Sequence, residues 1–251
     1  MHVFPSPRRR RGGSIFWIIF AVVIVAIVLG SSLIGALSVC AATGSDPADS
    51  LLGLVGLDDG VDTREAPGDA RAFDPLAALP EIAAYAGEGA RLISVEIALV
   101  RADGTLDLKA SYTPKPQVTY TFAREIPRPA DAPPPGAGGA NTGPWHEPVE
   151  VRVYEPGQRR RRTTTSGGVR RTVDYVNKGM ERDVGEASAA AVAFVETPAC
   201  RIAEFWKAAI AQGAPADGVA RITYDADGYD FAVTGFRVSL RFGADCALKP
   251  K

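Results

Sequence analysis

Residues 15–39 read IFWIIFAVVIVAIVLGSSLIGALSV, and this stretch organises the whole chain. It has no charged residue, and Ile15–Leu29 is apolar throughout. About 20 apolar residues are enough for a helix to cross a bilayer, so the stretch predicts a transmembrane helix. Arg8–Arg11 lie just before it, and no further basic residue follows until Arg64. Because positive flanks stay in the cytoplasm, we expect the N-terminus inside and the rest of the chain outside.

Two other interpretations of the N-terminal region remain open. A cleaved secretory signal would use Cys40-Ala41-Ala42 as its small-residue site, although the apolar core of a signal is normally only about 7–15 residues long. The sequence Leu37-Ser38-Val39-Cys40 resembles a bacterial lipobox, in which the cysteine is lipidated, but Val39 departs from the small residue expected there. All three interpretations place the remainder of the chain outside the cytoplasm.

The composition indicates a bacterial envelope protein. The formal net charge is −1, but four of the 28 basic residues precede the apolar stretch, so the exterior part carries about −5 with its 29 acidic residues. A negative exterior argues against nucleic-acid binding. The excess of Arg over Lys suits a GC-rich bacterial genome. We therefore expect a bacterial inner (cytoplasmic) membrane protein with a periplasmic or extracellular C-terminal domain. Ser31 and Gly35 form a small-xxx-small pair that would permit dimerisation, or that simply reflects small residues common in spans.

The chain divides by composition into seven segments. They are a basic tail (1–14), the transmembrane helix (15–39), an acidic flexible tether (40–72), a first folded unit (73–123), a Pro/Gly-rich exposed loop (124–148), a basic hairpin with its connection (149–196) and a second folded unit (197–251). About 210 residues follow the span, which is enough for one sizeable domain or two small ones.

The first folded unit shows one helix signal followed by three strand signals. Asp74-Pro75 combines a good N-cap with the proline favoured at the first helical position. Apolar residues then alternate along 91–101, 106–112 and 118–122, which predicts strands. Asp103-Gly104 lies between the first two and is a strong hairpin signal.

The second folded unit repeats this order. Thr197-Pro198 is again a cap followed by proline, and a helical apolar stripe follows, formed by Ile202, Phe205, Trp206, Ala209 and Ile210. Alternating segments 220–224, 229–233 and 236–242 predict strands, with an Asp227-Gly228 turn between the first two. The shared order predicts an α+β fold, in which a duplicated α-β-β-β unit forms one antiparallel sheet with both helices on one face. The alternatives are a coincidence of common elements and two separate small domains.

The sharpest surface feature is the predicted hairpin around Gly167-Gly168. Its strands hold six arginines, namely Arg159, Arg160, Arg161, Arg162, Arg170 and Arg171. Arginine suits bidentate contact with carboxylates and phosphates, so these residues are candidates for binding an anionic partner. The competing interpretations are a solvated edge hairpin whose charge prevents strand association and an ion pair with the acidic tether of the same chain.

Cys200 and Cys246 are predicted to form a disulfide, because both lie outside the cytoplasm and the last strand can return to the helix start. Two separate buried thiols are the alternative. The only exterior histidine, His146, falls in the Pro/Gly-rich loop and is interpreted as solvated. Acidic residues near Gly228 are interpreted as turn chemistry, not as a calcium site. The sequence predicts no metal and no cofactor.

These observations favour a membrane-anchored, extracytoplasmic binding or scaffold module of the cell envelope. The expected partner is an anionic envelope polymer or an acidic protein surface. The alternative is an enzyme that acts on an envelope polymer with carboxylates that the sequence does not identify. A deep pocket with two carboxylates of perturbed pKa would favour the enzyme, whereas a shallow surface with a protruding basic hairpin would favour binding.

Overall fold

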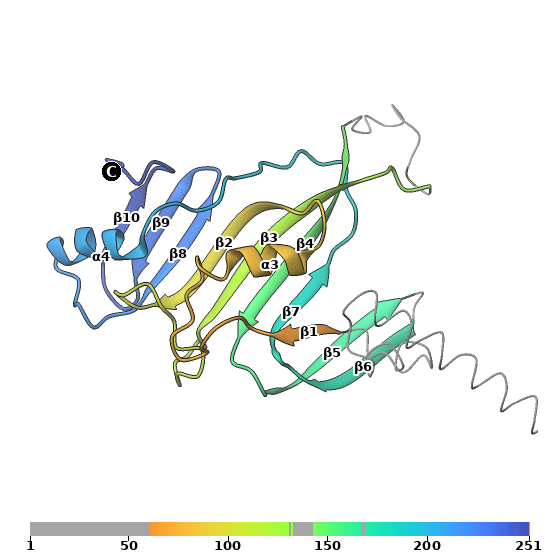
Figure 1. Cartoon of the computed structure of the whole chain (residues 1–251), viewed down its shortest axis with the longest axis horizontal. Helices are drawn as coiled ribbons and strands as arrows, with labels where there is room; N and C mark the ends of the chain where they lie inside the picture. The colour runs from red at the N-terminus through yellow and green to blue at the C-terminus, as the bar shows by residue number, and fades with distance from the viewer. Residues whose placement is uncertain (1–60, 131, 133–142, 167–168, 251) are drawn as a thin grey trace, which may run out of the picture. The chain divides into compact units, whose positions relative to one another are not determined.

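The computed structural model describes residues 61–130, 132, 143–166 and 169–250. This part is mostly antiparallel sheet (Figure 1). The strands are β1 (Asp62–Glu65), β2 (Arg91–Val100), β3 (Gln117–Ile126), β4 (Trp145–Tyr154), β5 (Arg159–Ser166), β6 (Val169–Val176), β7 (Gly179–Val184), β8 (Ala220–Asp225), β9 (Gly228–Val233) and β10 (Ser239–Phe242), and the helices are α3 (Leu79–Ala86) and α4 (Ile202–Ala211).

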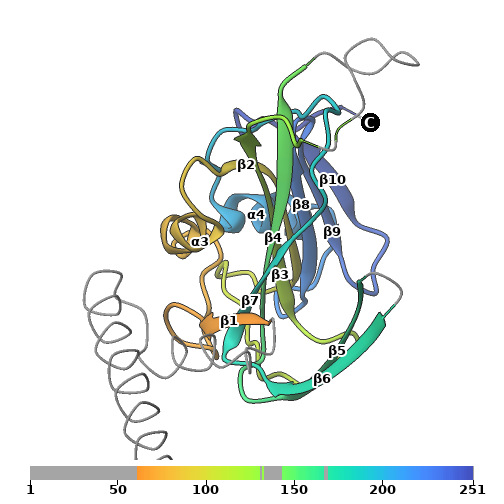
Figure 2. The ribbon, with the colours of Figure 1, turned by 90° about the vertical axis from the view of Figure 1, so that its right-hand side faces the viewer.

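Eight strands form one antiparallel sheet in the order β1-β7-β4-β3-β2-β8-β9-β10. Strands β5 and β6 form a separate two-stranded sheet, which we call the arginine hairpin (Arg159–Val176). Both helices lie on one face of the large sheet, and the arginine hairpin lies toward the other face (Figure 2). The large sheet therefore has a helix-covered face and a helix-free face.

The helix-covered face holds the hydrophobic core. Helix α4 buries Phe205 and Trp206, whose rings lie 4.4 Å from Phe242 and 5.4 Å from Phe231, measured between centroids. Helix α3 buries Ile82 and Tyr85. The strands contribute every second side chain to this core, as the pleat requires, so their remaining side chains point to the helix-free face.

The predicted helix start at Asp74-Pro75 is wrong, because α3 begins only at Leu79, with Ala78 as its N-cap and no capping side chain. The Asp74 carboxylate instead accepts hydrogen bonds from the backbone N–H groups of Leu76 and Ala77 at 2.9 and 3.0 Å, in a turn ahead of the helix. The β8–β9 turn is a tight hairpin in which Asp225 pairs with Gly228. A side chain at Gly228 is excluded, because its φ is +103° and an added Cβ would lie 2.3 Å from the Phe242 carbonyl oxygen.

The predicted α+β fold with a duplicated α-β-β-β unit was wrong. The predicted strand 106–112 is not a strand, because Leu106 pairs in an isolated bridge with Phe73, ahead of α3, and the Leu108 N–H donates to the Ala70 carbonyl. The apolar alternation there reflects the complete burial of Leu106 and Leu108. The ten strands and two short helices of the described part make this a sheet-dominated fold.

The interval 124–148 was also predicted incorrectly in part. Strand β3 continues to Ile126, and β4 begins at Trp145, so the two strands pair over ten residues from Gln117↔Tyr154 to Ile126↔Trp145. His146 is therefore a strand residue with only 8% of its surface exposed, not a solvated loop residue. The prolines and glycines in the middle of this interval predicted a loop for all of it, although strands occupy both of its ends.

The predicted transmembrane helix at 15–39 lies outside the described residues, as do Cys40 and most of the acidic tether. In the part that the structure describes, neither helix is long and apolar enough to span a membrane.

The predicted Cys200–Cys246 disulfide is confirmed. The two Cα atoms are 5.5 Å apart, and Cys200 lies just before α4, whereas Cys246 follows β10. Beyond it the chain folds back along the outer edge of β10, with a bridge between Phe242 and Leu248 and a 2.8 Å hydrogen bond from the Lys249 N–H to the Arg241 carbonyl. The disulfide thus holds the C-terminal segment against the sheet.

Candidate functional site

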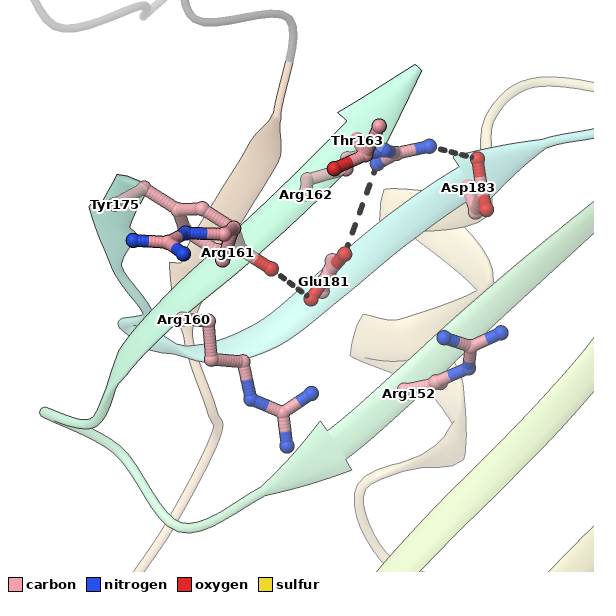
Figure 3. A pocket seen from close by; sticks show the side chains of 8 residues that line it. All are labelled: Arg152, Arg160, Arg161, Arg162, Thr163, Tyr175, Glu181 and Asp183. Atoms are coloured by element: carbon pink, nitrogen blue, oxygen red, sulfur yellow. Dashed lines mark hydrogen bonds and ion pairs between the residues drawn. The ribbon is translucent and has the colours of Figure 1, made fainter. Parts of the chain in front are cut away.

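The candidate site lies between the arginine hairpin and the helix-free face of strands β4 and β7. A cavity of about 440 Å³ opens there (Figure 3). Its lining residues are Arg152, Arg160, Arg161, Arg162, Thr163, Tyr175, Glu181 and Asp183. We call this cavity the arginine pocket. It contains three of the six arginines predicted to bind an anion, together with one arginine and two carboxylates that sequence reasoning did not single out.

The alternation of β5 divides the predicted arginines between the two faces of the hairpin. Arg160 pairs with Tyr175 and Arg162 with Val173, and these residues share the face that contacts the large sheet. Arg161 pairs with Asp174 on the opposite face, where its Nε lies 2.7 Å from the Asp174 Oδ1. This ion pair lowers the pKa of Asp174, chiefly through the hydrogen bond from Arg161.

Arg159 and Arg170 share the outward face with Arg161. The register partner of Arg159, Val176, lies two positions from Asp174 on β6, and Arg170 itself lies four positions from Asp174 on that strand. Both side chains are exposed. Arg171 is also exposed, but the alternation places it on the same hairpin face as Arg160 and Arg162. The structure therefore brings the six arginines onto one hairpin without gathering them on one surface.

Glu181 is the centre of the contacts between hairpin and sheet. Its side chain is 91% buried, and it accepts hydrogen bonds from the hydroxyls of Tyr154 on β4 and Tyr175 on β6, the latter at 2.9 Å. Arg162 on β5 lies 3.6 Å from the other carboxylate oxygen and also pairs with Asp183 (Figure 3). One carboxylate thus joins three strands by charged and polar contacts.

Both tyrosines are held as hydrogen-bond donors. Burial raises the pKa of Tyr154 well above its ordinary value, and the hydrogen bond to Glu181 and the charge of Glu181 raise it further. Burial and Glu181 raise the pKa of Tyr175 in the same way, while Arg160 acts in the opposite direction on both. The hydroxyls consequently stay protonated at neutral pH and keep Glu181 as their acceptor.

The remaining cations of the pocket are Arg152 and Arg160. Desolvation lowers the pKa of Arg152, but the hydrogen bond to Glu150 and the charges of Glu150, Glu181 and Asp183 outweigh it, so the pKa is raised. The guanidinium of Arg160 lies 3.7 Å from the centroid of the Tyr154 ring. Among the described residues Arg160 has no carboxylate within ion-pair distance, and its close electrostatic contact is the face of the Tyr154 ring.

The pocket offers a ligand mainly donors. Glu181 already accepts two hydroxyl hydrogen bonds and faces Arg162, while Asp183 binds Arg162 through Oδ1. A general base needs a lone pair directed at the proton that it removes, and Glu181 is engaged elsewhere. The guanidinium groups of Arg152 and Arg160 are accordingly the groups best placed to meet a bound molecule.

The other residues considered in the sequence lie elsewhere. His146 contacts the Phe194 ring at 5.6 Å between centroids, far along β4 from the pocket, and its Nδ1 is buried without a hydrogen-bond partner in the described structure. At the β8–β9 turn the Lys249 ammonium donates to the Asp227 carbonyl at 2.5 Å, and Arg241 pairs with Asp230.

The tyrosines of this molecule provide a pH test of the packing. Burial is the largest cause of a raised pKa at Tyr85, Tyr120, Tyr154, Tyr175, Tyr224 and Tyr229. A pKa that is higher in the folded than in the unfolded state adds stability that is complete below the unfolded value and is lost as pH rises through the folded value. We therefore expect stability to fall above about pH 10, by about 1.4 kcal/mol per pH unit for each tyrosine that ionises only after unfolding.

Ultraviolet absorbance of tyrosinate measures this directly. The native protein at about pH 11 should show much less tyrosinate than the same protein in denaturant, whose tyrosines titrate near 10. Coincident native and denatured titration curves would show that the hydroxyls of Tyr120 and Tyr154 are not buried as described.

Comparison with protein-family models, curated proteins and solved structures found no match for this chain. The function therefore has to follow from the chemistry of the residues themselves.

Proposed function

We propose that this chain is an extracytoplasmic binding or scaffold module of the cell envelope, and that the arginine hairpin binds an anionic partner. The supporting observation is the charge of the hairpin, which carries six arginines and a single acidic residue, Asp174, over Arg159–Val176. The outward face presents Arg159, Arg161 and Arg170 to solvent. Guanidinium groups in this setting suit carboxylate, sulfate or phosphate groups on a polymer or on an acidic protein surface.

The placement outside the cytoplasm is the second element of the proposal. Disulfides persist in oxidising compartments, and the Cys200–Cys246 disulfide agrees with such a location. The apolar stretch 15–39 and its preceding arginines give the orientation, with the N-terminus inside. The proposed location is supported by the sequence and by the disulfide, whereas the proposed binding surface is supported by the arginine hairpin.

Retention on an anionic matrix tests the binding surface. The double variant R159Q/R170Q removes two outward charges, and the structure shows neither residue in contact with Glu181. We expect it to elute from a sulfated polysaccharide matrix at clearly lower salt than the parent protein, because exposed charges act over a screening length of about 8–10 Å at physiological ionic strength. Its stability should stay within about 0.5 kcal/mol of the parent.

A matched control is available on the same sheet. The variant R221Q/R241Q also removes two exposed arginines, each paired with one carboxylate at 2.8 Å, on strands β8 and β10. It changes the net charge equally and should elute close to the parent protein. Equal elution of the parent and R159Q/R170Q, or an equal shift in both variants, would refute a binding role for the hairpin.

A further inference from the structure

Guanidinium groups and carboxylates face the same cavity in the arginine pocket. On adjacent strands, Arg152 of β4 lies opposite Glu181 of β7, and Glu150 lies opposite Asp183. In Figure 3, Arg162 lies on one side of Glu181, and the separate side chains of Arg152 and Arg160 lie on the other. A molecule bound there would meet the arginine donors and, beside them, only those carboxylate oxygens that the protein does not already engage.

The acceptor side of the pocket has one open position. Arg162 donates to the Oδ1 atom of Asp183, whereas Oδ2 has no hydrogen-bond partner among the described residues. The Asp183 side chain as a whole is 45% exposed. An ionised carboxylate accepts hydrogen bonds and donates none, so Oδ2 selects a ligand group that carries a hydrogen, such as a hydroxyl.

Two arginines form the donor side of the pocket, Arg152 on β4 and Arg160, which reaches over β4 from β5. Arg160 covers the Tyr154 ring, and Arg152 precedes Tyr154 by two residues on the same face of β4. Two residues along a strand span about 7 Å, so a carboxylate can approach both guanidinium groups. The fork of an arginine matches the two oxygens of a carboxylate.

The charges discriminate between classes of anion. A phosphate or sulfate chain would bring two or more closely spaced negative charges toward Glu150, Glu181 and Asp183, and like charges at short range are unfavourable. A monoanion with several hydroxyls meets less of this repulsion and can contact both sides of the pocket. The volume of about 440 Å³ lies within the usual range for small-ligand sites.

The surface beside the pocket continues the same chemistry. The helix-free positions next to Arg152 are Thr119 on β3 and then Glu96 on β2. The Thr119 hydroxyl can donate and accept hydrogen bonds along a polyhydroxylated chain, whereas the Glu96 carboxylate, one oxygen of which binds Arg221, can only accept them. A ligand unit in the pocket therefore has room for neighbouring units across the sheet.

We propose that the arginine pocket binds a hydroxylated carboxylate, the chemistry of a uronic-acid unit in an acidic polysaccharide. The ligand carboxylate lies between Arg152 and Arg160, and a ring hydroxyl donates to Oδ2 of Asp183. This inference rests on the proposed function, because it names the class of anion that the hairpin region takes.

Titration of the purified full-length protein with oligogalacturonate, a neutral maltooligosaccharide of equal length and tripolyphosphate tests the inference. We expect saturable binding of oligogalacturonate, weaker binding of tripolyphosphate and none of the neutral sugar. The variant R160Q should bind oligogalacturonate about tenfold more weakly, the loss expected for one hydrogen-bonded charge. R160K, which keeps the charge but not the fork, should fall between R160Q and the parent, and R241Q should match the parent.

Replacement of Asp183 gives the most specific readout, because it should change the affinities for two ligands in opposite directions. In D183N the remaining acceptor oxygen faces Arg162, so an NH2 group takes the place of Oδ2, and one repulsive charge is lost. The variant should therefore bind oligogalacturonate more weakly and tripolyphosphate more tightly than the parent protein. A parallel weakening of both ligands in D183N would overturn the proposed ligand class, as would tighter binding of tripolyphosphate than of oligogalacturonate by the parent protein.

The failure of this inference is distinguishable from the failure of the proposed function. If R160Q matches the parent for every ligand while R159Q/R170Q still elutes early from the anionic matrix, the pocket assignment is wrong and the hairpin remains the binding surface. If neither variant differs from the parent, both proposals are wrong. Thermal unfolding of R160Q and D183N confirms that each variant is folded before its titration is interpreted.

Discussion

Reduction of the Cys200–Cys246 disulfide is expected to lower the free energy of unfolding by about 4 kcal/mol, the chain-entropy estimate for a closed loop of this length. The two cysteines are separated by 46 residues, and the loop between them contains α4 and strands β8, β9 and β10. Denaturant unfolding with and without a reductant measures the difference, and intact mass after alkylation shows how many thiols are free.

The variant C200A/C246A separates the cross-link from other effects of the reductant. It should unfold at the same denaturant concentration in both conditions, near the midpoint of the reduced parent protein. The slope of the transition should also rise without the cross-link, because the unfolded chain becomes less compact. An unchanged midpoint in the reduced parent protein would contradict the prediction.

Replacement of Glu181 by alanine is expected to cost about 2–4 kcal/mol, because it leaves buried donors without their acceptor. The hydroxyls of Tyr154 and Tyr175 both donate to Glu181, and Arg162 loses one of its two carboxylate partners. Chemical denaturation measures the loss. Hydrogen exchange at the amides of the arginine hairpin should also accelerate, because Glu181 contacts Arg162 of β5 and Tyr175 of β6.

Two further variants provide losses of stability with which the loss in E181A can be compared. E181Q retains one acceptor oxygen and should lose less than E181A. E96A removes an exposed carboxylate whose partner is Arg221, with side chains 51% and 63% exposed, and should cost no more than about 1 kcal/mol. Equal losses for E181A and E96A would show that Glu181 is not the buried junction described here.

The parts of the fold that could be predicted from the sequence are those set by local periodicity. Ile202, Phe205, Trp206 and Ala209 are buried along one face of α4, as their helical spacing indicates. Ile210 belongs to the same predicted stripe but is 42% exposed and lies one residue before the end of the helix. Strands β8 and β9 and their turn also follow from alternation and from Asp227-Gly228.

The rest could not be predicted, because pairing partners far apart in the sequence leave no local signal. Strand β7 carries Glu181, Arg182 and Asp183 in succession, so apolar alternation does not identify it. Its place between β1 and β4 depends on contacts such as the 2.6 Å ion pair of Arg182 with Asp62. For the site, alternation along 159–162 assigns Arg160 and Arg162 to a common face, but it does not show that this face meets a buried carboxylate.

The pairing of β2 with β8 also controls the order in which the molecule can assemble. Glu96 and Arg221, which form an ion pair across these two strands, are 125 residues apart in the sequence. Contacts of such long range slow folding, because a large loop must close before they form. While the chain is being synthesised from its N-terminus, β2 exists as an open edge with Val95 and Ile97 lacking their β8 neighbours. Closure of the sheet at β2 and β8 is consequently a late step, which can be completed only after β8 has been synthesised.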